Sequence, residues 1–337
     1  MNGAESLART LVASGVEICF ANPGTSEMHF VSALDRVTGL RCVLGLAETV
    51  VTGCADGYAR MAGKPAATLM HCGPGLGNGI ANLHNARRAH TPMVNIVGDH
   101  ATWHRPHDSP LTADTEGLAR AVSHWVRTSA NSRSMGQDAA AVVQAARTPP
   151  GQIATLILPA DCAWDEGAEP GAPLAPPARA SVAPEIVNNI ARALRAGVPA
   201  MLMLSGAALT ERGLRAAHRV AHLTGARLRT PTQVPRMARG RGRVPVDRIP
   251  YVVDAALKVL EGTRHLVLAG AKAPVGFFGY PGKPSTLWPT SSARRAKLPC
   301  PNRDRAPKPS AAASTPKPSA TPSPRCCRRT RWSLRMQ

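Results

Sequence analysis

The chain has 337 residues, of which 44% are hydrophobic, and a formal net charge of +20 at pH 7. This composition is typical of a globular protein, and the length suffices for two domains with cores of their own. No apolar run approaches the roughly 18 residues of a membrane-spanning helix, and the N-terminus has no secretory signal pattern. We therefore expect a cytoplasmic protein without a membrane partner.

The positive charge is concentrated near the C-terminus. Residues 291–337 contain twelve Lys and Arg and one Asp, whereas the first 290 residues contain 29 basic and 20 acidic residues. The charge therefore says little about the function of the first 290 residues. The eight cysteines form no CxxC pair and no zinc spacing with histidine, so we expect neither a metal ribbon nor a disulfide framework.

Strand and helix patterns alternate along the first 165 residues. Asn2 followed by Glu5 resembles a capping box that opens a first helix. The later pattern predicts strands at 17–21, 40–46, 66–71, 93–98 and 152–160, and helices at 26–36, 48–62, 78–89 and 139–146. Such alternation predicts an α/β fold with a parallel sheet that is covered by helices on both faces.

The rest of the chain divides into three further parts. Residues 166–184 contain five prolines and no apolar periodicity, which predicts an extended linker. Residues 185–290 form a shorter and less regular α/β pattern. Its expected strands lie at 200–206 and 265–271, and its expected helices at about 210–224 and 251–260.

Residues 291–337 are rich in proline and basic residues and have no periodic apolar face, so we expect them to be disordered. Two origins of this segment stay open, a natural basic tail and a frame shift in the gene. We favour the frame shift, because the second domain stops before its sheet is complete.

Glu48 stands where a β-like run turns into a helix. On a helical wheel it shares one face with Val51, Ala55, Tyr58 and Ala62, so its side chain is predicted to point into the protein. A first-turn acid can simply complement the helix dipole. A buried carboxylate is costly, however, and suggests a function.

Two other segments follow predicted strands. Residues 71–79, HCGPGLGNG, could hold a phosphate on backbone N–H groups, but they lack the GxGxxG and Walker spacings, and a tight turn fits them equally well. Residues 21–30, ANPGTSEMHF, offer the hydroxyl groups of Thr25 and Ser26. In an open parallel sheet the carboxyl ends of the strands lie at one edge, where ligands bind.

These segments, together with AETVVTGCADGYARMAGKPA at 47–66 and LVLAGAKAPVGFFGYPGKPS at 266–285, resemble thiamine-diphosphate-dependent enzymes. The resemblance covers about residues 1–290 and is to the acetolactate synthase large subunit and benzoylformate decarboxylase groups. It implies that residues 1–165 are the pyrimidine-binding domain and that residues 185–290 are an incomplete, Rossmann-like central domain.

The resemblance implies a catalytic role for Glu48 and for His71. The matching glutamate hydrogen-bonds a ring nitrogen of the cofactor's aminopyrimidine and favours the imino form, which removes a proton from the thiazolium ring. His71 matches a proton-relay histidine of the benzoylformate decarboxylase group. A purely structural histidine at the end of a strand is an equally good interpretation of His71.

The resemblance also implies binding roles. Glu48 and His71 would contact the cofactor, and Pro23, Pro74 and Asn78 match positions that line its pyrimidine pocket. Thr25 takes the place of a substrate-contacting serine. The substrate class is a small 2-oxo acid, which is either decarboxylated or joined to a second carbonyl compound.

Further implications concern assembly and flavin. The family builds its site between two subunits, so a homo-oligomer formed through the N-terminal domain is expected. Acetolactate synthases bind FAD on the central domain, whereas similar domains elsewhere in the family bind none. Flavin binding by this chain therefore stays open.

One departure from the family concerns the anchoring of the diphosphate. The family binds Mg²⁺ and diphosphate through a C-terminal domain with a GDG motif, and this sequence contains no GDG; GDH at 98–100 is not that motif. Such contacts supply much of the affinity. We therefore expect a truncated enzyme that binds thiamine diphosphate weakly and has little activity by itself.

Other interpretations are weaker. A basic protein that binds nucleic acid through its tail is one alternative, but the tail has a single aromatic residue, Trp332, and no recognition helix. An inactive frame-shifted product is another. His100, His104 and His107 could meet a metal, but Pro106 and the loop position favour a solvated segment, so we expect no metal there.

Overall fold

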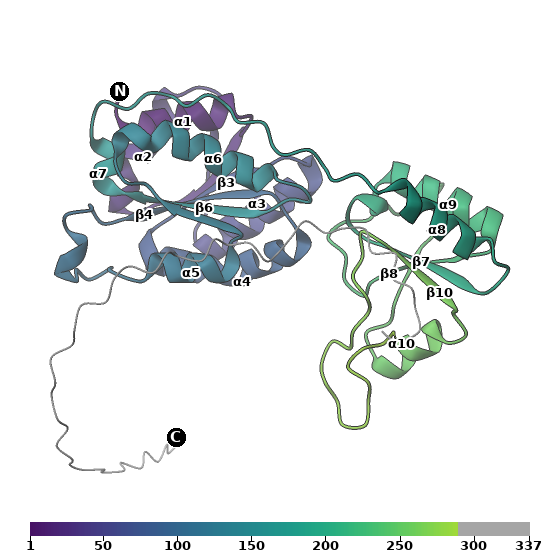
Figure 1. Cartoon of the computed structure of the whole chain (residues 1–337). Coiled ribbons are helices and arrows are strands. Elements are labelled where there is room, and N and C mark those ends of the chain that lie inside the picture. The colour runs from purple at the N-terminus through teal and green to yellow at the C-terminus, as the bar shows by residue number, and fades with distance from the viewer. Residues whose placement is uncertain (289–337) are drawn as a thin grey trace, which may run out of the picture. The chain divides into compact units, whose positions relative to one another are not determined.

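The first sheet contains six parallel strands in the order β2-β1-β3-β4-β6-β5 (Figure 1). The structure is a computed structural model, and it describes residues 1–288. The strands are β1 (Ile18–Asn22), β2 (Arg41–Leu44), β3 (Ala66–Met70), β4 (Met93–Asp99), β5 (Trp125–Thr128) and β6 (Ile153–Pro159). This arrangement confirms the α/β fold with a parallel sheet.

Helices cover both faces of this sheet (Figure 1). One face carries α1 (Gly3–Ala13), α2 (Met28–Arg36), α6 (Met135–Arg147) and α7 (Ala160–Trp164). The other face carries α3 (Glu48–Ala62), α4 (Cys72–Ala89) and α5 (Thr115–Val122). Short 3-10 helices, η1 (Thr25–Glu27), η2 (Arg105–His107) and η3 (Ser132–Ser134), lie in the connections.

The three central strands β3, β4 and β6 are buried along their whole length, as expected for strands covered on both faces. A chain of polar side chains nevertheless crosses them. Thr68 Oγ1 donates to Asn95 Oδ1 at 2.8 Å, and Asn95 Nδ2 donates to Thr155 Oγ1 at 3.1 Å. Because these residues face one another in the strand register, each buried polar group has a partner.

The start of α4 differs from the sequence prediction. We expected a turn over residues 71–79 and a helix from residue 78, but the helix begins at Cys72. Glycine and proline usually indicate a turn, whereas Pro74 is tolerated in a first helical turn and the glycines permit close packing. The short elements α5 and β5 were also missing from the prediction.

The second sheet is also parallel, with the order β10-β7-β8-β9. Its strands are β7 (Ala200–Leu204), β8 (Arg227–Thr230), β9 (Asp247–Arg248) and β10 (His265–Ala269). Its helices are α8 (Pro184–Leu194), η4 (Gly206–Leu209), α9 (Glu211–Thr224) and α10 (Val253–Leu260). Two clusters of buried apolar side chains, one on each face, form its core.

The segment between α7 and α8 is extended, and its first half packs on the helices of the first sheet. Ser6 Oγ donates to the Glu169 carbonyl oxygen at 2.7 Å, and Gly171 N donates to Thr10 Oγ1 at 2.9 Å. Thus α1 holds this part of the predicted linker in place.

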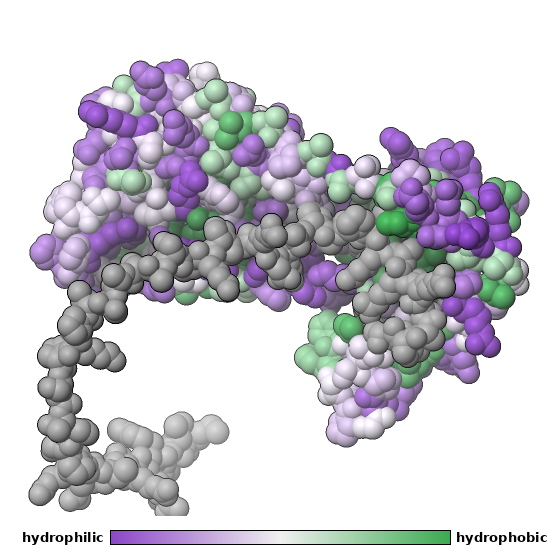
Figure 2. All heavy atoms as spheres, viewed as in Figure 1, coloured by the Kyte–Doolittle hydropathy of each residue, from purple (hydrophilic) through white to green (hydrophobic). Residues whose placement is uncertain are grey.

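None of the described helices is long and apolar enough to cross a lipid bilayer. Figure 2 shows hydrophilic and hydrophobic side chains interspersed on the visible face of the described residues. The expected disordered tail, residues 291–337, lies outside the described residues.

Candidate functional site

The predicted site residues lie at the carboxyl ends of β1, β2 and β3. Glu48 begins α3 shortly after β2, and His71 directly follows β3. Thr25 lies in η1, just after β1. Because the three strands are parallel neighbours, their ends meet at the same edge of the sheet, which is the usual ligand-binding edge of this fold class.

Glu48 is buried, with 6% of its surface exposed. Its Oε2 accepts a 3.0 Å hydrogen bond from Asn78 Nδ2 on α4. No lysine or arginine among residues 1–288 forms an ion pair with it. Val51 and Ala55 are buried beside it as predicted, whereas Ala62, at the end of α3, is exposed.

One glycine at the start of α4, Gly75, is required by a close contact with Glu48. A Cβ atom at this position would lie 2.6 Å from Glu48 Oε1 and 3.4 Å from the Cβ of His71. Any side chain here would therefore displace the Glu48 carboxylate. By contrast, a Cβ atom at Gly77 would meet nothing within 4 Å. Gly75 thus allows α4 to pack directly against the Glu48 carboxylate.

His71 pairs with an acid that the sequence analysis did not select. His71 Nδ1 lies 2.8 Å from Oε2 of Glu27, the last residue of η1. The Glu27 side chain is fully buried, and the same oxygen accepts a 2.7 Å hydrogen bond from Gly24 N. Burial raises the pKa of the Glu27 carboxyl, while the Gly24 N–H and His71 oppose this effect.

Cys72 is the neighbour of this pair and begins α4. Its backbone is in the left-handed region, with φ of 51°, which is uncommon for a residue other than glycine and occurs often at functional sites. Its Sγ lies 3.4 Å from Ser26 Oγ and 3.7 Å from His71 Nδ1. Burial raises the pKa of the Cys72 thiol to about 11, so it is uncharged at neutral pH.

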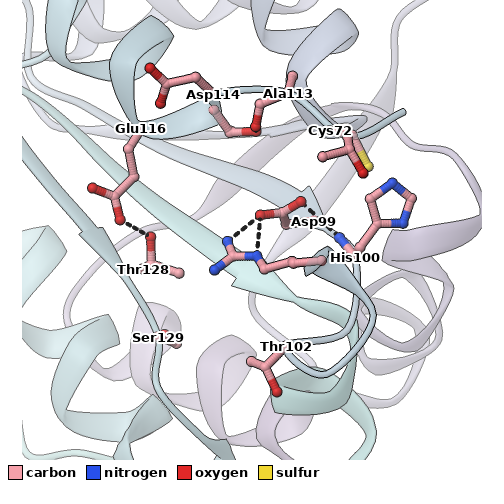
Figure 3. A network of polar contacts seen from close by, with 12 residues as sticks. Cys72, Asp99, His100, Thr102, Ala113, Asp114, Glu116, Thr128 and Ser129 are labelled. Atoms are coloured by element: carbon pink, nitrogen blue, oxygen red, sulfur yellow. Dashed lines mark hydrogen bonds and ion pairs between the residues drawn. The ribbon is translucent and has the colours of Figure 1, made fainter. Parts of the chain in front are cut away.

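The loop after β4 runs beside this edge (Figure 3). Asp99 Oδ2 accepts hydrogen bonds from the Arg105 guanidinium, and Asp99 Oδ1 accepts a 2.8 Å bond from His100 N. At the other end of the network, Thr128 Oγ1 donates to Glu116 Oε1 at 2.6 Å. The bonds to Asp99 connect His100 and Arg105 of the loop to the end of β4, and the Thr128–Glu116 bond joins β5 to α5.

Among residues 1–288, one group of side chains has potential metal-ligand atoms close together, and the histidines of this loop are not part of it. His100 Nε2 instead lies 3.0 Å from Ser109 Oγ, and the His100 and His104 rings are 5.9 Å apart. That grouping consists of Glu27, His71 and Cys72, whose ligand atoms lie within 4.8 Å of one another. Hydrogen bonding already connects these three side chains.

The structure thus brings Glu48, Asn78 and His71 to one place. Thr25 and Pro74 are exposed, and Pro23 is half-buried. Their roles stay predictions. The only sequence signal for Glu27 was its position three residues after Gly24, where an acid can cap the start of a helix. Many helices have such an acid without a functional role.

Comparison with known proteins identifies the first domain. Residues 1–118 match the family model "Thiamine pyrophosphate enzyme, N-terminal TPP binding domain". Residues 1–118 thus form an N-terminal domain of the thiamine pyrophosphate enzyme type. Thiamine pyrophosphate is another name for thiamine diphosphate, so the resemblance seen in the sequence is confirmed.

The match to relatives extends beyond residue 118. It is 54% identical over 289 residues to the Mycobacterium tuberculosis protein named "Putative acetolactate synthase large subunit IlvX", covering 86% of this chain and 56% of that protein. It is 31% identical over 157 residues to benzoylformate decarboxylase of Pseudomonas aeruginosa, covering 46% of this chain and 29% of the decarboxylase. The chain thus spans about half the length of IlvX.

Solved structures share the fold. The thiamine diphosphate-dependent 4-hydroxybenzoylformate decarboxylase of Rhodococcus jostii RHA1 matches with a TM-score of 0.71 and 23% identity, over 84% of this chain and 54% of that chain. Benzoylformate decarboxylase of Polynucleobacter necessarius matches with a TM-score of 0.73 and 20% identity, over 87% and 55% of the two chains. At these identities the comparison establishes the fold alone.

Proposed function

We propose that this chain supplies the pyrimidine-binding side of a thiamine diphosphate site in a 2-oxo-acid decarboxylase or carboligase. One observation carries the proposal. The Glu48 carboxylate is buried, one of its oxygens accepts a hydrogen bond from Asn78, and the other lies against Gly75 without a cationic partner among residues 1–288.

The residues present fit an aminopyrimidine ring. A buried carboxylate without a cationic partner is costly unless another group shares a proton or a hydrogen bond with it. A ring nitrogen that shares a proton with Glu48 would meet this need, and Gly75 lets the carboxylate keep its position because a Cβ atom there would lie 2.6 Å from Oε1. The exposed Pro74 and Asn78 lie on the same helical turns as Gly75 and are available to line the ring.

Each residue of the site has a separate task in this proposal. When bound, thiamine diphosphate supplies the electron sink for loss of carbon dioxide from a 2-oxo acid. Glu48 would share a proton with the pyrimidine ring, and Asn78, which hydrogen-bonds Glu48, would orient the carboxylate. His71 exchanges a proton near the substrate, and the exposed Thr25 hydroxyl is available to contact the substrate.

A second copy of the chain is proposed to cover the edge of the site. Leu44 at the end of β2 is 69% exposed and Leu46, two residues before Glu48, is 91% exposed. Val50 on α3 is also exposed. Apolar side chains gathered at a sheet edge are typical of an interface between chains.

The pyrimidine half of the cofactor tests the proposal without the diphosphate. We expect 4-amino-5-hydroxymethyl-2-methylpyrimidine to bind the full chain with a Kd of roughly 1 mM, a free energy of about −4 kcal/mol. Saturation-transfer NMR can detect such binding. The Gly75→Ala variant should bind at least about tenfold more weakly, because its methyl group would displace the Glu48 carboxylate.

Gly77→Ala is the matched control, since its methyl group meets no atom within 4 Å and lies on the same helix. It should bind like the unchanged chain. Equal binding by Gly75→Ala and Gly77→Ala would contradict a ring beside Glu48.

Intact thiamine diphosphate tests the expectation that this chain by itself binds the cofactor weakly. The sequence contains no GDG motif for Mg²⁺ and diphosphate, so calorimetry with both should give a Kd well above the micromolar range and little turnover of 2-oxo acids. Micromolar binding would show that the chain anchors the diphosphate in another way.

A further inference from the structure

We propose that Glu27 is a positioning residue whose buried carboxylate keeps a proton on Nδ1 of His71, so that Nε2 is the nitrogen that exchanges protons with a ligand. This inference rests on the proposed function, because it names the group that prepares His71 for proton transfer in the same site. It concerns an acid that neither the sequence motifs nor the relatives' names assign.

Three elements hold the Glu27 carboxylate in place. Gly24 N, ahead of η1, donates a 2.7 Å hydrogen bond to Oε2. His71 Nδ1, at the end of β3, lies 2.8 Å from the same oxygen. A Cβ atom at Gly98, in β4, would overlap Oε1, so the strand accommodates the carboxylate only because it has glycine there. The side chain therefore cannot turn away from His71.

The hydrogen-bond chemistry determines the tautomer of the imidazole. A backbone N–H group can only donate, so the 2.7 Å bond from Gly24 makes Oε2 an acceptor. An ionised carboxylate can only accept, at Oε2 as at Oε1. The nitrogen at 2.8 Å from Oε2 is therefore the one that carries hydrogen, and a neutral imidazole with Nδ1–H has its lone pair on Nε2.

The orientation of the ring directs Nε2 outward. Gly24 lies against the ring, because a Cβ atom there would overlap His71 Cγ, Nδ1 and Cε1. The His71 side chain is 24% exposed while Glu27 is fully buried, and the two ring nitrogens lie on different sides of the ring. With Nδ1 directed at the buried acid, the accessible side of the ring carries Nε2.

The other ionisable groups around the pair do not compete for Nδ1. The thiol of Cys72 lies 3.7 Å from it, which is a weaker contact than the carboxylate. Glu48 accepts its hydrogen bond from Asn78 instead, and Asp99 pairs with Arg105 and raises the pKa of the Cys72 thiol. Glu27 is thus the group that determines the state of His71.

The tautomer determines which nitrogen of His71 accepts a proton. His71 would accept a proton at Nε2 and would become an imidazolium that the Glu27 carboxylate stabilises across 2.8 Å. A carboxylate that holds a histidine in this way raises the rate of proton transfer by keeping the correct tautomer and orientation. Its removal leaves the imidazole in place but with the wrong nitrogen protonated.

The test is to observe the His71 tautomer directly. NMR of the full chain with ¹⁵N-labelled histidine distinguishes a protonated ring nitrogen from one with a lone pair, and the signal lost in His71→Asn identifies His71. At neutral pH we expect Nδ1 to be protonated and Nε2 to have the lone pair. The opposite tautomer in the unchanged chain overturns the proposal without any variant.

Glu27→Gln provides the second arm. The glutamine amide can donate as well as accept, so the population with a proton on Nε2 should rise from a minor to a major fraction. Glu48→Gln, which removes the other nearby acid without touching Nδ1, should leave the tautomer unchanged. An unchanged tautomer in Glu27→Gln, or an equal change in both variants, overturns the proposal.

A metal at the same three side chains would also overturn it. The full chain is titrated with Zn²⁺, and stoichiometric binding that displaces the Nδ1 proton would assign Glu27, His71 and Cys72 to a cation instead. None of these measurements uses the cofactor, so failure of pyrimidine binding and failure of this inference are distinguishable.

Discussion

Asn78 Nδ2 donates a 3.0 Å hydrogen bond to Glu48 Oε2 across 30 positions of sequence. The bond joins the first turn of α3 to the second turn of α4 and sets the direction of the carboxylate that begins α3. Without it the carboxylate could rotate toward solvent, and its other oxygen would no longer lie against Gly75.

Asn78→Ala should weaken binding of the pyrimidine half of the cofactor by about tenfold or more, because a hydrogen bond to a charged group contributes about 1.5–3 kcal/mol. The melting temperature should also fall, because the free chain loses the same hydrogen bond to the buried Glu48 carboxylate. Asn82→Ala is the control: Asn82 Nδ2 donates to the Thr49 carbonyl oxygen one turn later on the same helix. Equal losses in both variants would contradict a specific role for Asn78.

The buried polar chain across the first sheet predicts a large stability effect. Asn95→Ala should lower the free energy of unfolding by about 2–5 kcal/mol, because it leaves a cavity and removes the partner of Thr68 and one partner of Thr155. Urea denaturation followed by circular dichroism measures this. An effect below about 1 kcal/mol would mean that the hydroxyl groups find other partners.

Cysteine reactivity should follow burial and thiol ionisation. Burial raises the pKa of the Cys72 thiol to about 11, so about one thiol in a thousand is ionised at pH 8. Iodoacetamide at pH 8 should therefore label the exposed Cys42 and Cys54 and leave Cys72 unmodified until the chain unfolds. Peptide mass spectrometry measures each site. Rapid labelling of Cys72 would show that the start of α4 opens readily.

Self-association should depend on the exposed leucine before α3. If a second copy covers the sheet edge, Leu46→Lys should shift the chain toward the monomer in light scattering coupled to size-exclusion chromatography. Leu223, which is 83% exposed on α9, provides a matched control in Leu223→Lys. A chain that stays associated in Leu46→Lys would place the interface elsewhere.

Several features followed from local patterns. The helix of residues 48–62 was predicted with the bounds that α3 has, because its apolar period is clear and Gly63 adopts the left-handed conformation that ends a helix. The parallel sheet followed from the alternation of apolar runs and helices. The inward direction of Glu48 followed from the same period.

Other features had no local signal. The start of α4 was misjudged because glycine and proline favour turns in isolation, while the reasons for Gly75 and Gly79 are close contacts with Glu48 and Thr52 on another helix. The edge strand β5, which pairs with β6, was missed because a four-residue strand is too short to show a clear period.

The sequence by itself determined the fold class, the position of Glu48 and the family, because periodicity and short motifs are properties of neighbouring residues. The tertiary structure decided the partners. Glu27 meets His71 across 44 positions and Asn78 meets Glu48 across 30, because parallel strands bring their carboxyl ends to one edge whatever the length of chain between them.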